Sequence, residues 1–267
     1  MSLKLAVQEQ MLLGRTLVEK WEFARSVGFD GIELRGEGAG KFADRRPEIR
    51  AAGEAGAVIP TVCVMMDHFI GDFDADRRRD AVDNMKILLS VIAEAGGLGA
   101  ITPAAYGMFS RALPPFTPPR SSDEDRETLL AGLRELGEHA AAEGVTLLLE
   151  PLNRYEDHMV NTLEQGAALC REVGLPSVRV IGDFFHMNIE EADPAESLRR
   201  AAPYIAHMQL GDSGRLEPGT GHVDFLAGIA ALDEAGYDGW YAMECGLSGD
   251  PADVLPAVST YLRGGGR

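Results

Sequence analysis

Basic residues are scarce in this chain of 267 residues. It has 25 Lys and Arg against 42 Asp and Glu, which gives a formal net charge of −17. Proteins that bind a phosphate backbone usually present a basic face to it. The two dense basic clusters, residues 45–46 and 77–79, have acidic neighbours, as is typical of solvated helix faces. We therefore expect no nucleic-acid partner.

Cysteines and long apolar runs are also few. Cys63, Cys170 and Cys245 are widely spaced and form no CxxC pair, so neither a disulfide framework nor a zinc knuckle is expected. No apolar stretch approaches the ~18 residues of a membrane-spanning helix. Polar residues 8–10 interrupt the N-terminal segment, which lacks the apolar core of a signal peptide. These features favour reduced thiols, a cytoplasmic location and no membrane partner.

A glycine-rich phosphate loop is missing after the first expected strand, which argues against a doubly wound open sheet. Short β-like runs instead alternate with amphipathic stretches, and several stretches end in glycine before the next run, as in AEGVTLLLE. We expect strands over residues 3–7, 30–34, 58–65, 98–102, 145–150, 178–183, 205–210 and 240–244. We expect helices over residues 16–27, 46–55, 76–95, 122–143, 162–173, 194–202, 225–235 and 251–262. Eight such units predict an α/β fold, a single (β/α)8 TIM barrel forming one domain over residues 1–267.

Oxygen-bearing side chains end four successive strands of the predicted barrel. Glu150, Asp183, Gln209 and Glu244 stand at or near the ends of the fifth to eighth strands, where barrel enzymes place their chemistry. Three converging carboxylates repel one another unless a cation lies between them. Oxygen ligands favour Mg²⁺, Mn²⁺ or Co²⁺, whereas structural zinc prefers Cys and His. The alternative is that each acid pairs with an arginine or caps the next helix.

Three further polar residues follow these strand ends. His186 comes three residues after Asp183, and Arg215 comes six residues after Gln209 in a glycine-rich segment. Glu156 lies in the EPLNRYE motif, where it could hydrogen-bond a substrate hydroxyl. We interpret all three as substrate-binding residues. A structural histidine and an ordinary surface turn are the alternatives for the first two.

The second and third strands offer a weaker signal. Glu33 ends the second expected strand, Cys63 lies near the end of the third, and His68 follows it. Each of these side chains either lines the pocket or packs as part of the structure, and the residue pattern leaves both readings open.

Four motifs carry a resemblance to a known family. In chain order, EPLNRYE, GDFFHMNIEE, HMQLGDSGRLEPGTGHVDF and AMEC resemble the xylose isomerase-like TIM barrels, most closely the D-tagatose/D-psicose 3-epimerase and hydroxypyruvate isomerase branches. The resemblance implies a divalent metal held by Glu150, Asp183, Gln209 and Glu244. The epimerases have His where this chain has Gln209, and its own His207 lies two residues earlier. Gln at this position resembles hydroxypyruvate isomerases and some sugar-acid dehydratases.

The resemblance also implies a reaction. The metal, Mn²⁺ or Mg²⁺ with Co²⁺ as a further candidate, chelates a carbonyl and an adjacent hydroxyl and stabilises an enediolate. One of Glu150 and Glu244 removes the carbon-bound proton, and the other returns it. We expect a metal-dependent isomerase or epimerase of a small α-hydroxy-carbonyl substrate, a ketose or hydroxy-keto acid. The alternative is a sugar-acid dehydratase, a lyase. The resemblance further suggests a homodimer or homotetramer.

Overall fold

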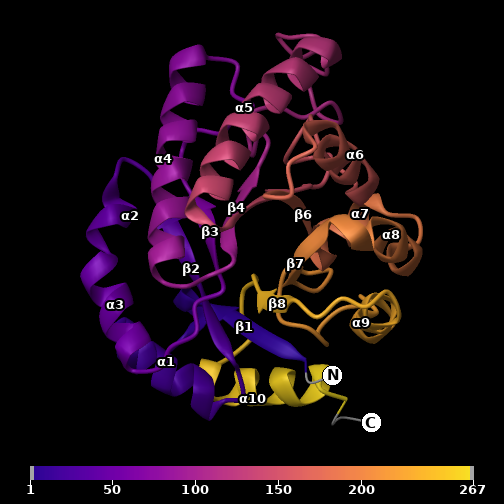
Figure 1. Cartoon of the computed structure of the whole chain (residues 1–267). Helices are drawn as coiled ribbons and strands as arrows, with labels where there is room; N and C mark the ends of the chain where they lie inside the picture. The colour runs from indigo at the N-terminus through magenta and orange to yellow at the C-terminus, as the bar shows by residue number, and fades with distance from the viewer. Residues whose placement is uncertain (1–2, 265–267) are drawn as a thin grey trace.

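The structure, a computed structural model, describes residues 3–264 and has at its centre a closed parallel barrel (Figure 1). The strands are β1 (Lys4–Gln8), β2 (Gly31–Glu37), β3 (Thr61–Met65), β4 (Gly99–Pro103), β5 (Thr146–Glu150), β6 (Val178–Asp183), β7 (Ile205–Leu210) and β8 (Trp240–Met243). Each strand pairs in parallel with the next, and β8 pairs with β1. The prediction of a (β/α)8 barrel is confirmed.

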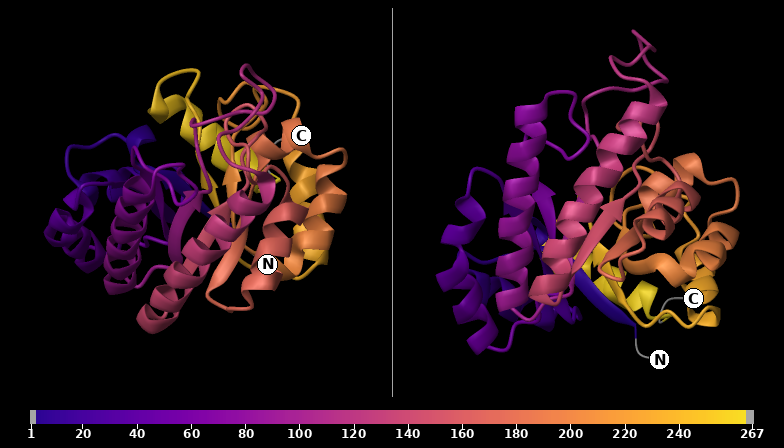
Figure 2. Two further views of the ribbon diagram at one scale, coloured as in Figure 1. Left: turned by 90° about the horizontal axis from the view of Figure 1, so that it is seen from above. Right: turned by 45° about the horizontal axis from the view of Figure 1, so that its top comes forward.

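Helices surround this barrel on its outside in every view (Figures 1 and 2). They are α1 (Leu17–Ser26), α2 (Lys41–Asp44), α3 (Arg46–Glu54), α4 (Ala75–Glu94), α5 (Ser122–Glu143), α6 (Leu163–Val173), α7 (Phe184–Glu190), α8 (Pro194–Ala201), α9 (Phe225–Glu234) and α10 (Pro251–Leu262). Short 3₁₀ turns cover Glu9–Met11 and Ala202–Tyr204. The sequence did not predict α2 and α7. Helix α7 follows β6 directly because the Asp183 carboxylate accepts the backbone N–H groups of Phe185 and His186.

Local signals explain where several helices begin and end. Thr16, Ser121 and Thr162 each cap a helix, and the side chain of the third helical residue returns a hydrogen bond to the cap backbone. Gly144 and Gly174 end α5 and α6 in the left-handed region, at φ 73° and 72°, which glycine adopts without steric cost. These signals set where each connection to the next strand starts.

The apolar core has two parts, and the smaller one supports the site. The larger part fills the space between the barrel and its helices. The smaller part lies inside the barrel and is formed by Cys63, Ile101, Leu148 and Ile181. Side chains two residues apart point to the same face of a strand. The residues two positions beyond Leu148 and Ile181 therefore also point into the barrel and form the next layer of its interior. Those residues are the carboxylates that end β5 and β6.

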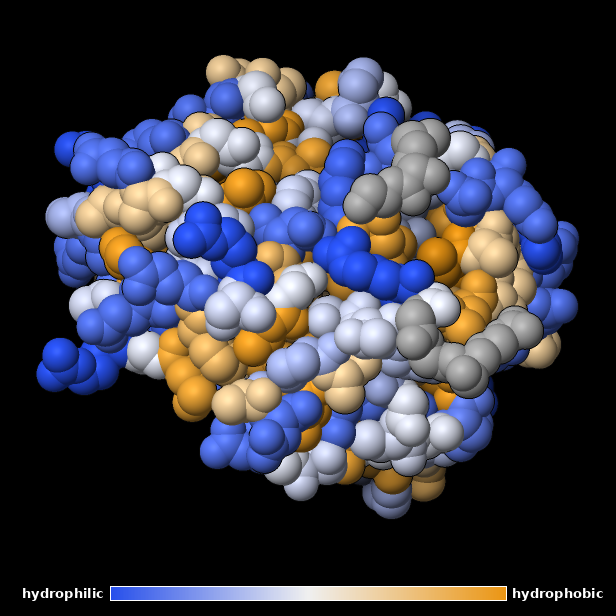
Figure 3. Space-filling model, turned by 90° about the horizontal axis from the view of Figure 1, so that it is seen from below, coloured by the Kyte–Doolittle hydropathy of each residue, from blue (hydrophilic) through white to orange (hydrophobic). Residues whose placement is uncertain are grey.

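No helix within residues 3–264 is both long and apolar enough to cross a bilayer. Figure 3 shows the molecule from below, where hydrophilic and apolar residues are interspersed.

Candidate active site

The four residues that the sequence predicts as metal ligands lie at one end of the barrel. Glu150 ends β5, Asp183 ends β6, Gln209 lies one residue before the end of β7, and Glu244 directly follows β8. Asp183 and Gln209 are direct partners in the sheet register. Glu150, Asp183 and Gln209 are 4%, 2% and 0% exposed. These three side chains are thus buried at the same end of the barrel.

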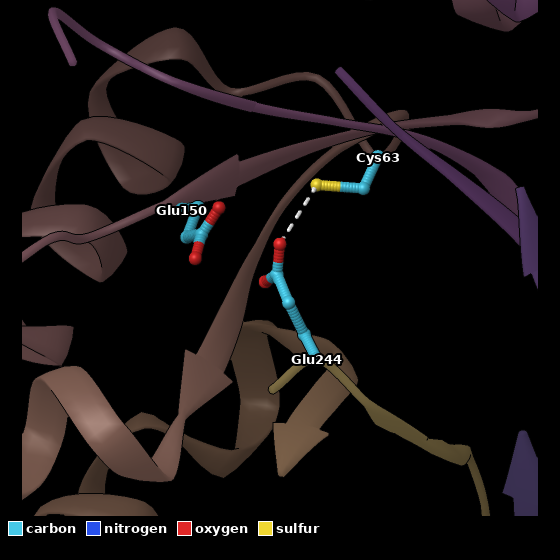
Figure 4. Close-up of side chains that lie close together, drawn as sticks. All are labelled: Cys63, Glu150 and Glu244. Atoms are coloured by element: carbon cyan, nitrogen blue, oxygen red, sulfur yellow. Dashed lines mark hydrogen bonds between the residues drawn. The ribbon is translucent and has the colours of Figure 1, made fainter. Parts of the chain in front are cut away.

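The carboxylates approach one another closely. One ligand atom each from Cys63, Glu150 and Glu244 lies within 4.8 Å of the other two, and the same holds for Glu150, Asp183 and His186. Figure 4 shows Cys63 and Glu244 pointing toward each other, with Glu150 beside them. The Cys63 Sγ lies 3.7 Å from Glu244 Oε1. Of the two readings left open for Cys63, the structure therefore shows the one in which it lines the pocket.

Several of these buried polar atoms lack a hydrogen-bond partner within residues 3–264. They are Asp183 Oδ2, His186 Nε2, Gln209 Oε1 and Glu244 Oε2. Buried polar atoms in folded proteins nearly always have a partner, and an unpartnered one costs about 1–3 kcal/mol. Four such atoms in one place indicate that the site is built to bind something else.

The pKa shifts of the carboxylates also indicate a site that binds a ligand. Burial, followed by the charges of Asp183 and Glu33, raises the pKa of Glu244 to about 7. Burial raises the pKa of Asp183 to about 6 and that of Glu150 well above its ordinary value, where Glu244 and Asp183 add repulsion. Arg215 offsets part of this repulsion. A bound cation would remove the rest, since it favours the charged carboxylates.

Glu33 forms a network that the sequence did not reveal. Its carboxylate is fully buried and accepts hydrogen bonds from Gln8 Nε2 at 2.9 Å, Thr61 Oγ1 at 2.7 Å and Gln209 Nε2 at 2.9 Å. His207 Nε2 lies 2.8 Å from Glu33 Oε2, the oxygen that also accepts from Thr61. Burial raises the pKa of Glu33, but these partners together lower it by more than burial raises it. The pKa of Glu33 therefore lies below its ordinary value. Glu33 accepts from the amide nitrogen of Gln209, and the amide oxygen of Gln209 has no hydrogen-bond partner among the described residues.

His186 is held in one neutral form. Its Nδ1 accepts the backbone N–H of Asn153 at 3.1 Å, so the ring proton of a neutral imidazole resides on Nε2. Burial, and then the charge of Arg215, lowers the pKa of His186 to about 3. Nε2 lies 3.7 Å from Glu150 Oε1 and 3.8 Å from Asp183 Oδ2. A protonated Nε2 is a hydrogen-bond donor and has no lone pair for a metal, which suits the substrate-binding role predicted for His186.

Arg215 and Glu156 lie at the edge of the same site. Arg215 Nη1 is 3.6 Å from Glu156 Oε2, and its guanidinium stands 4.5 Å from the centre of the Phe185 ring. The backbone of Arg215 has a φ of 54°, a strained value for a non-glycine residue that is common at functional sites. Asp212 holds this segment in place, since its carboxylate accepts the backbone N–H of Gly219 at 2.9 Å.

A cavity of about 440 Å³ opens at this end of the barrel. Its lining includes six residues that the sequence analysis named, which are Cys63, Glu150, Glu156, His186, Arg215 and Glu244. Asp183 and Gln209 are not among the residues that line it. His68 is not part of the lining, and its Nδ1 lies 2.7 Å from Asp80 Oδ2. His68 therefore belongs to a surface pair, whereas the other predicted residues are brought together.

Comparison with known proteins was made with both sequence and structure. The family model described as "Xylose isomerase-like TIM barrel" matches residues 21–263. The chain belongs to the xylose isomerase-like TIM barrel family. The resemblance carried by the four sequence motifs is thereby confirmed.

Members of this family with known activities are similar to the chain. The 3-dehydro-D-guloside 4-epimerase of Escherichia coli (strain K12) is 38% identical over 98% of this chain and 99% of its own length. The crystal structure of a 3-keto-D-glucoside 4-epimerase from E. coli is also 38% identical, with a TM-score of 0.93 and coverage of 98% and 99% of the two chains. The L-ribulose 3-epimerase of Mesorhizobium japonicum is 36% identical over 62% of this chain and 55% of its own. The chain is an enzyme of this isomerase and epimerase class.

Two hydrogen bonds in the site could not be predicted from the sequence patterns. The bond between Gln209 and Glu33 joins residues 176 positions apart, and the bond between Asn153 and His186 joins residues 33 positions apart. Glu33 had a signal, since it ends an apolar strand, but nothing in the sequence identifies its partners. Asn153 was visible only as part of the EPLNRYE motif.

Proposed function

We propose that this protein is a divalent-metal-dependent epimerase of a keto sugar. The observation that carries the proposal is the group of buried, unpartnered oxygens of Asp183, Gln209 and Glu244 beside the Glu150 carboxylate. The E. coli relative, which is similar over its whole length, is named for epimerisation at the carbon next to a sugar ketone. Such a reaction moves a proton on and off carbon, which requires acid/base groups.

The donor set fits a hard or borderline cation. Glu150, Asp183, Gln209 and Glu244 offer three carboxylates and one amide oxygen, which suit Mn²⁺ or Mg²⁺, with Co²⁺ as a further candidate. The raised pKa values of the carboxylates are the repulsion that such a charge relieves. When bound, the cation supplies Lewis-acid stabilisation of negative charge on substrate oxygens.

Glu150 and Glu244 are the proposed acid/base pair. They come from β5 and the end of β8, which are not neighbouring strands, so they approach the centre of the barrel from different sides. One glutamate takes the proton from the carbon beside the carbonyl, which leaves a flat enediolate. The other delivers a proton to the opposite face of that carbon, which inverts its configuration. The first glutamate acts in its carboxylate form and the second in its carboxylic acid form.

Three residues are proposed to hold the substrate. His186 Nε2–H donates a hydrogen bond to the carbonyl end of the substrate, because its own Nδ1 is already occupied. Arg215 lies beside the carboxylates and adds positive charge where the enediolate develops negative charge. Glu156, next to Arg215, accepts a hydrogen bond from a substrate hydroxyl.

Deuterium incorporation in D₂O tests this function. The Mn²⁺-loaded protein is incubated with a 3-keto-glucoside, a panel of ketoses and hydroxypyruvate, and products are followed by NMR. We expect exchange at the carbon next to the carbonyl together with the epimer, and loss of both in Glu150→Gln and Glu244→Gln. Glu138→Gln, an exposed glutamate on α5, serves as the matched control. Exchange with loss of water from the substrate would identify a dehydratase instead, and no exchange with any substrate would refute the proposal.

We also propose a cytoplasmic enzyme that assembles as a homodimer or homotetramer. Cys63, Cys170 and Cys245 are free thiols, as expected in a reducing compartment. The assembly rests on the family resemblance. Light scattering after size-exclusion chromatography measures it, and a monomeric mass at micromolar concentration would contradict this part of the proposal.

A further inference from the structure

The cavity is lined by two chemically different surfaces. On the side of β5 to β8 stand the acidic and basic groups described above. On the side of β3 and β4 stand Met65, Met66, Phe69 and Tyr106, which line the same cavity and are here called the apolar shelf. The charged residues Arg35 and Asp67 also line the cavity. Met65 ends β3, and Met66 and Phe69 follow it. Tyr106 lies three residues after β4, in the segment 104–121 that projects in the right-hand view of Figure 2.

The apolar shelf is open to solvent although it is apolar. Met65 is 46% and Tyr106 50% exposed, whereas Phe69 beneath them is 6% exposed. The Phe69 and Tyr106 rings meet edge to face, with their centres 5.9 Å apart, and the Arg35 guanidinium contacts the Met65 sulfur. Single exposed apolar residues are ordinary, but a contiguous group usually marks a binding surface. Here the group is continuous with the catalytic cavity, so its occupant is part of what that cavity binds.

We propose that the apolar shelf binds the aglycone of a glycoside substrate, and that this aglycone is apolar and best matched by an aromatic ring. The proposal rests on the proposed function, because it takes Glu150 and Glu244 as the groups that face the reacting carbon. In a pyranose ring, C1 and C4 are on opposite sides of the ring. When C4 and its neighbouring ketone face the glutamates, C1 and its substituent point away from them, across the cavity and toward the shelf.

The chemistry of the shelf favours this occupant over a second sugar. A sugar ring presents several hydroxyls that need hydrogen-bond partners, whereas the shelf offers two thioethers, two aromatic rings and a single hydroxyl, that of Tyr106. Methionine sulfur and aromatic edges make favourable contacts with another aromatic ring. The cavity volume of about 440 Å³ lies within the range of pockets that enclose drug-sized ligands. A free ketose has no substituent to cover the shelf.

Two matched pairs of ligands test the subsite. The first pair is the 3-keto derivatives of phenyl and methyl β-D-glucoside, compared by kcat/KM for deuterium exchange in the Mn²⁺-loaded protein. The second pair is the inert phenyl and methyl β-D-glucosides, compared by calorimetric Kd. We expect the phenyl compound to be favoured about tenfold in both, because burying an aromatic ring contributes more than 1.4 kcal/mol. Tyr106→Ala and Met65→Ala should each reduce this ratio severalfold.

Phe116→Ala is the matched control for these variants. Phe116 is 56% exposed on the same segment as Tyr106 but does not line the cavity, so its removal should leave the phenyl-to-methyl ratio unchanged. Equal kcat/KM and equal Kd for phenyl and methyl compounds would overturn the subsite while the epimerase function stands. A phenyl preference in Kd without any exchange would refute the epimerase function and leave the subsite standing.

A second copy of this chain is the competing occupant of the apolar shelf. Size-exclusion chromatography of Tyr106→Ala and Met65→Ala separates the two cases. We expect an unchanged elution volume for both variants. A shift to a smaller species, with an unaltered phenyl preference, would assign the shelf to a subunit interface and overturn the proposal.

Discussion

The buried carboxylates at this end of the barrel differ in their hydrogen bonding and in the direction of their pKa shifts. Glu33 on β2 is surrounded by donors from Gln8, Thr61, His207 and Gln209, and its pKa is lowered despite complete burial. Asp183 and Glu244, at the ends of β6 and β8, each keep an unpartnered buried oxygen, and their pKa values are raised.

The number of hydrogen-bond donors around each carboxylate distinguishes a structural carboxylate from one that binds a ligand. Burial acts on both groups alike, so the surrounding donors decide the direction of the pKa shift. A carboxylate with all its donors in place contributes to stability, whereas one left without donors costs stability until a ligand arrives. The two groups meet at Gln209, whose amide nitrogen donates to Glu33 and whose amide oxygen has no hydrogen-bond partner within residues 3–264.

The largest expected effect is on activity. Glu244→Gln should lower kcat/KM by roughly 10²–10⁴-fold, because it removes an acid/base group. The free energy of unfolding of the metal-free protein should not fall, since the substitution removes a charge that repels its neighbours. Steady-state kinetics and urea unfolding measure the two quantities. A metal-free variant that is several kcal/mol less stable would place Glu244 in the structural group with Glu33.

The next largest effect concerns stability at Glu33. Glu33→Ala should lower the free energy of unfolding by about 3–5 kcal/mol, because it leaves the buried donors of His207, Thr61 and Gln209 without their acceptor. Urea unfolding in the presence of EDTA measures this without any contribution from metal. A loss below about 1 kcal/mol would show that Glu33 is not a structural carboxylate.

A third effect is the pH dependence of stability. The folded-state pKa values of Glu244 and Asp183, about 7 and about 6, exceed the ordinary values near 4. Between about pH 4.5 and pH 7 the folded state therefore binds more protons than the unfolded state, and stability falls as pH rises. The slope is about 1.4 kcal/mol per pH unit for each retained proton.

Urea unfolding of the metal-free protein across this pH range checks the slope. Glu244→Gln should flatten it, and saturating Mn²⁺ should cancel or reverse it, because the metal requires deprotonated ligands. Glu33→Gln should flatten the slope less than Glu244→Gln does, because the charge of Glu33 is only one of the causes that raise the pKa values of Glu244 and Asp183, after burial. An unaltered slope in Glu244→Gln would contradict the assignment of the raised pKa.

The smallest effect comes from removing one donor. Thr61→Val deletes the 2.7 Å hydrogen bond to Glu33 but leaves its other partners in place. We expect the free energy of unfolding to fall by about 1 kcal/mol, with Mn²⁺ affinity within a fewfold of the wild type. A loss as large as that of Glu33→Ala would mean that Thr61, rather than the network, holds this carboxylate.

Most of the fold was readable from the sequence because each unit carries its own local signals. Apolar runs, capping residues and terminal glycines lie within a few positions of the element they define, as at Ser121 and Gly144 around α5. Helix α7 was missed because it follows β6 without a loop, and Asp183 serves as its cap as well as a site residue. The four-residue helix α2 is too short to show a helical period.

The candidate site was predictable in part for a related reason. The end of a strand is a local position, so Glu150, Asp183, Gln209 and Glu244 could be found by where the apolar runs stop. Which atoms lack partners depends on the closed barrel, in which Glu33 and Gln209 meet from β2 and β7. The contrast between satisfied and unsatisfied carboxylates therefore appears only in three dimensions.

Mn²⁺ binding to the purified, EDTA-treated protein tests the central claim most directly. Isothermal titration at pH 7.5 should give one ion per chain, with protons released on binding, and affinity at least a hundredfold weaker in Asp183→Asn and in Glu244→Gln. Thr61→Val, on the satisfied side, should bind nearly as the wild type does. Absence of stoichiometric binding in the wild type, or wild-type affinity in both site variants, would contradict a cation site at the ends of β5 to β8.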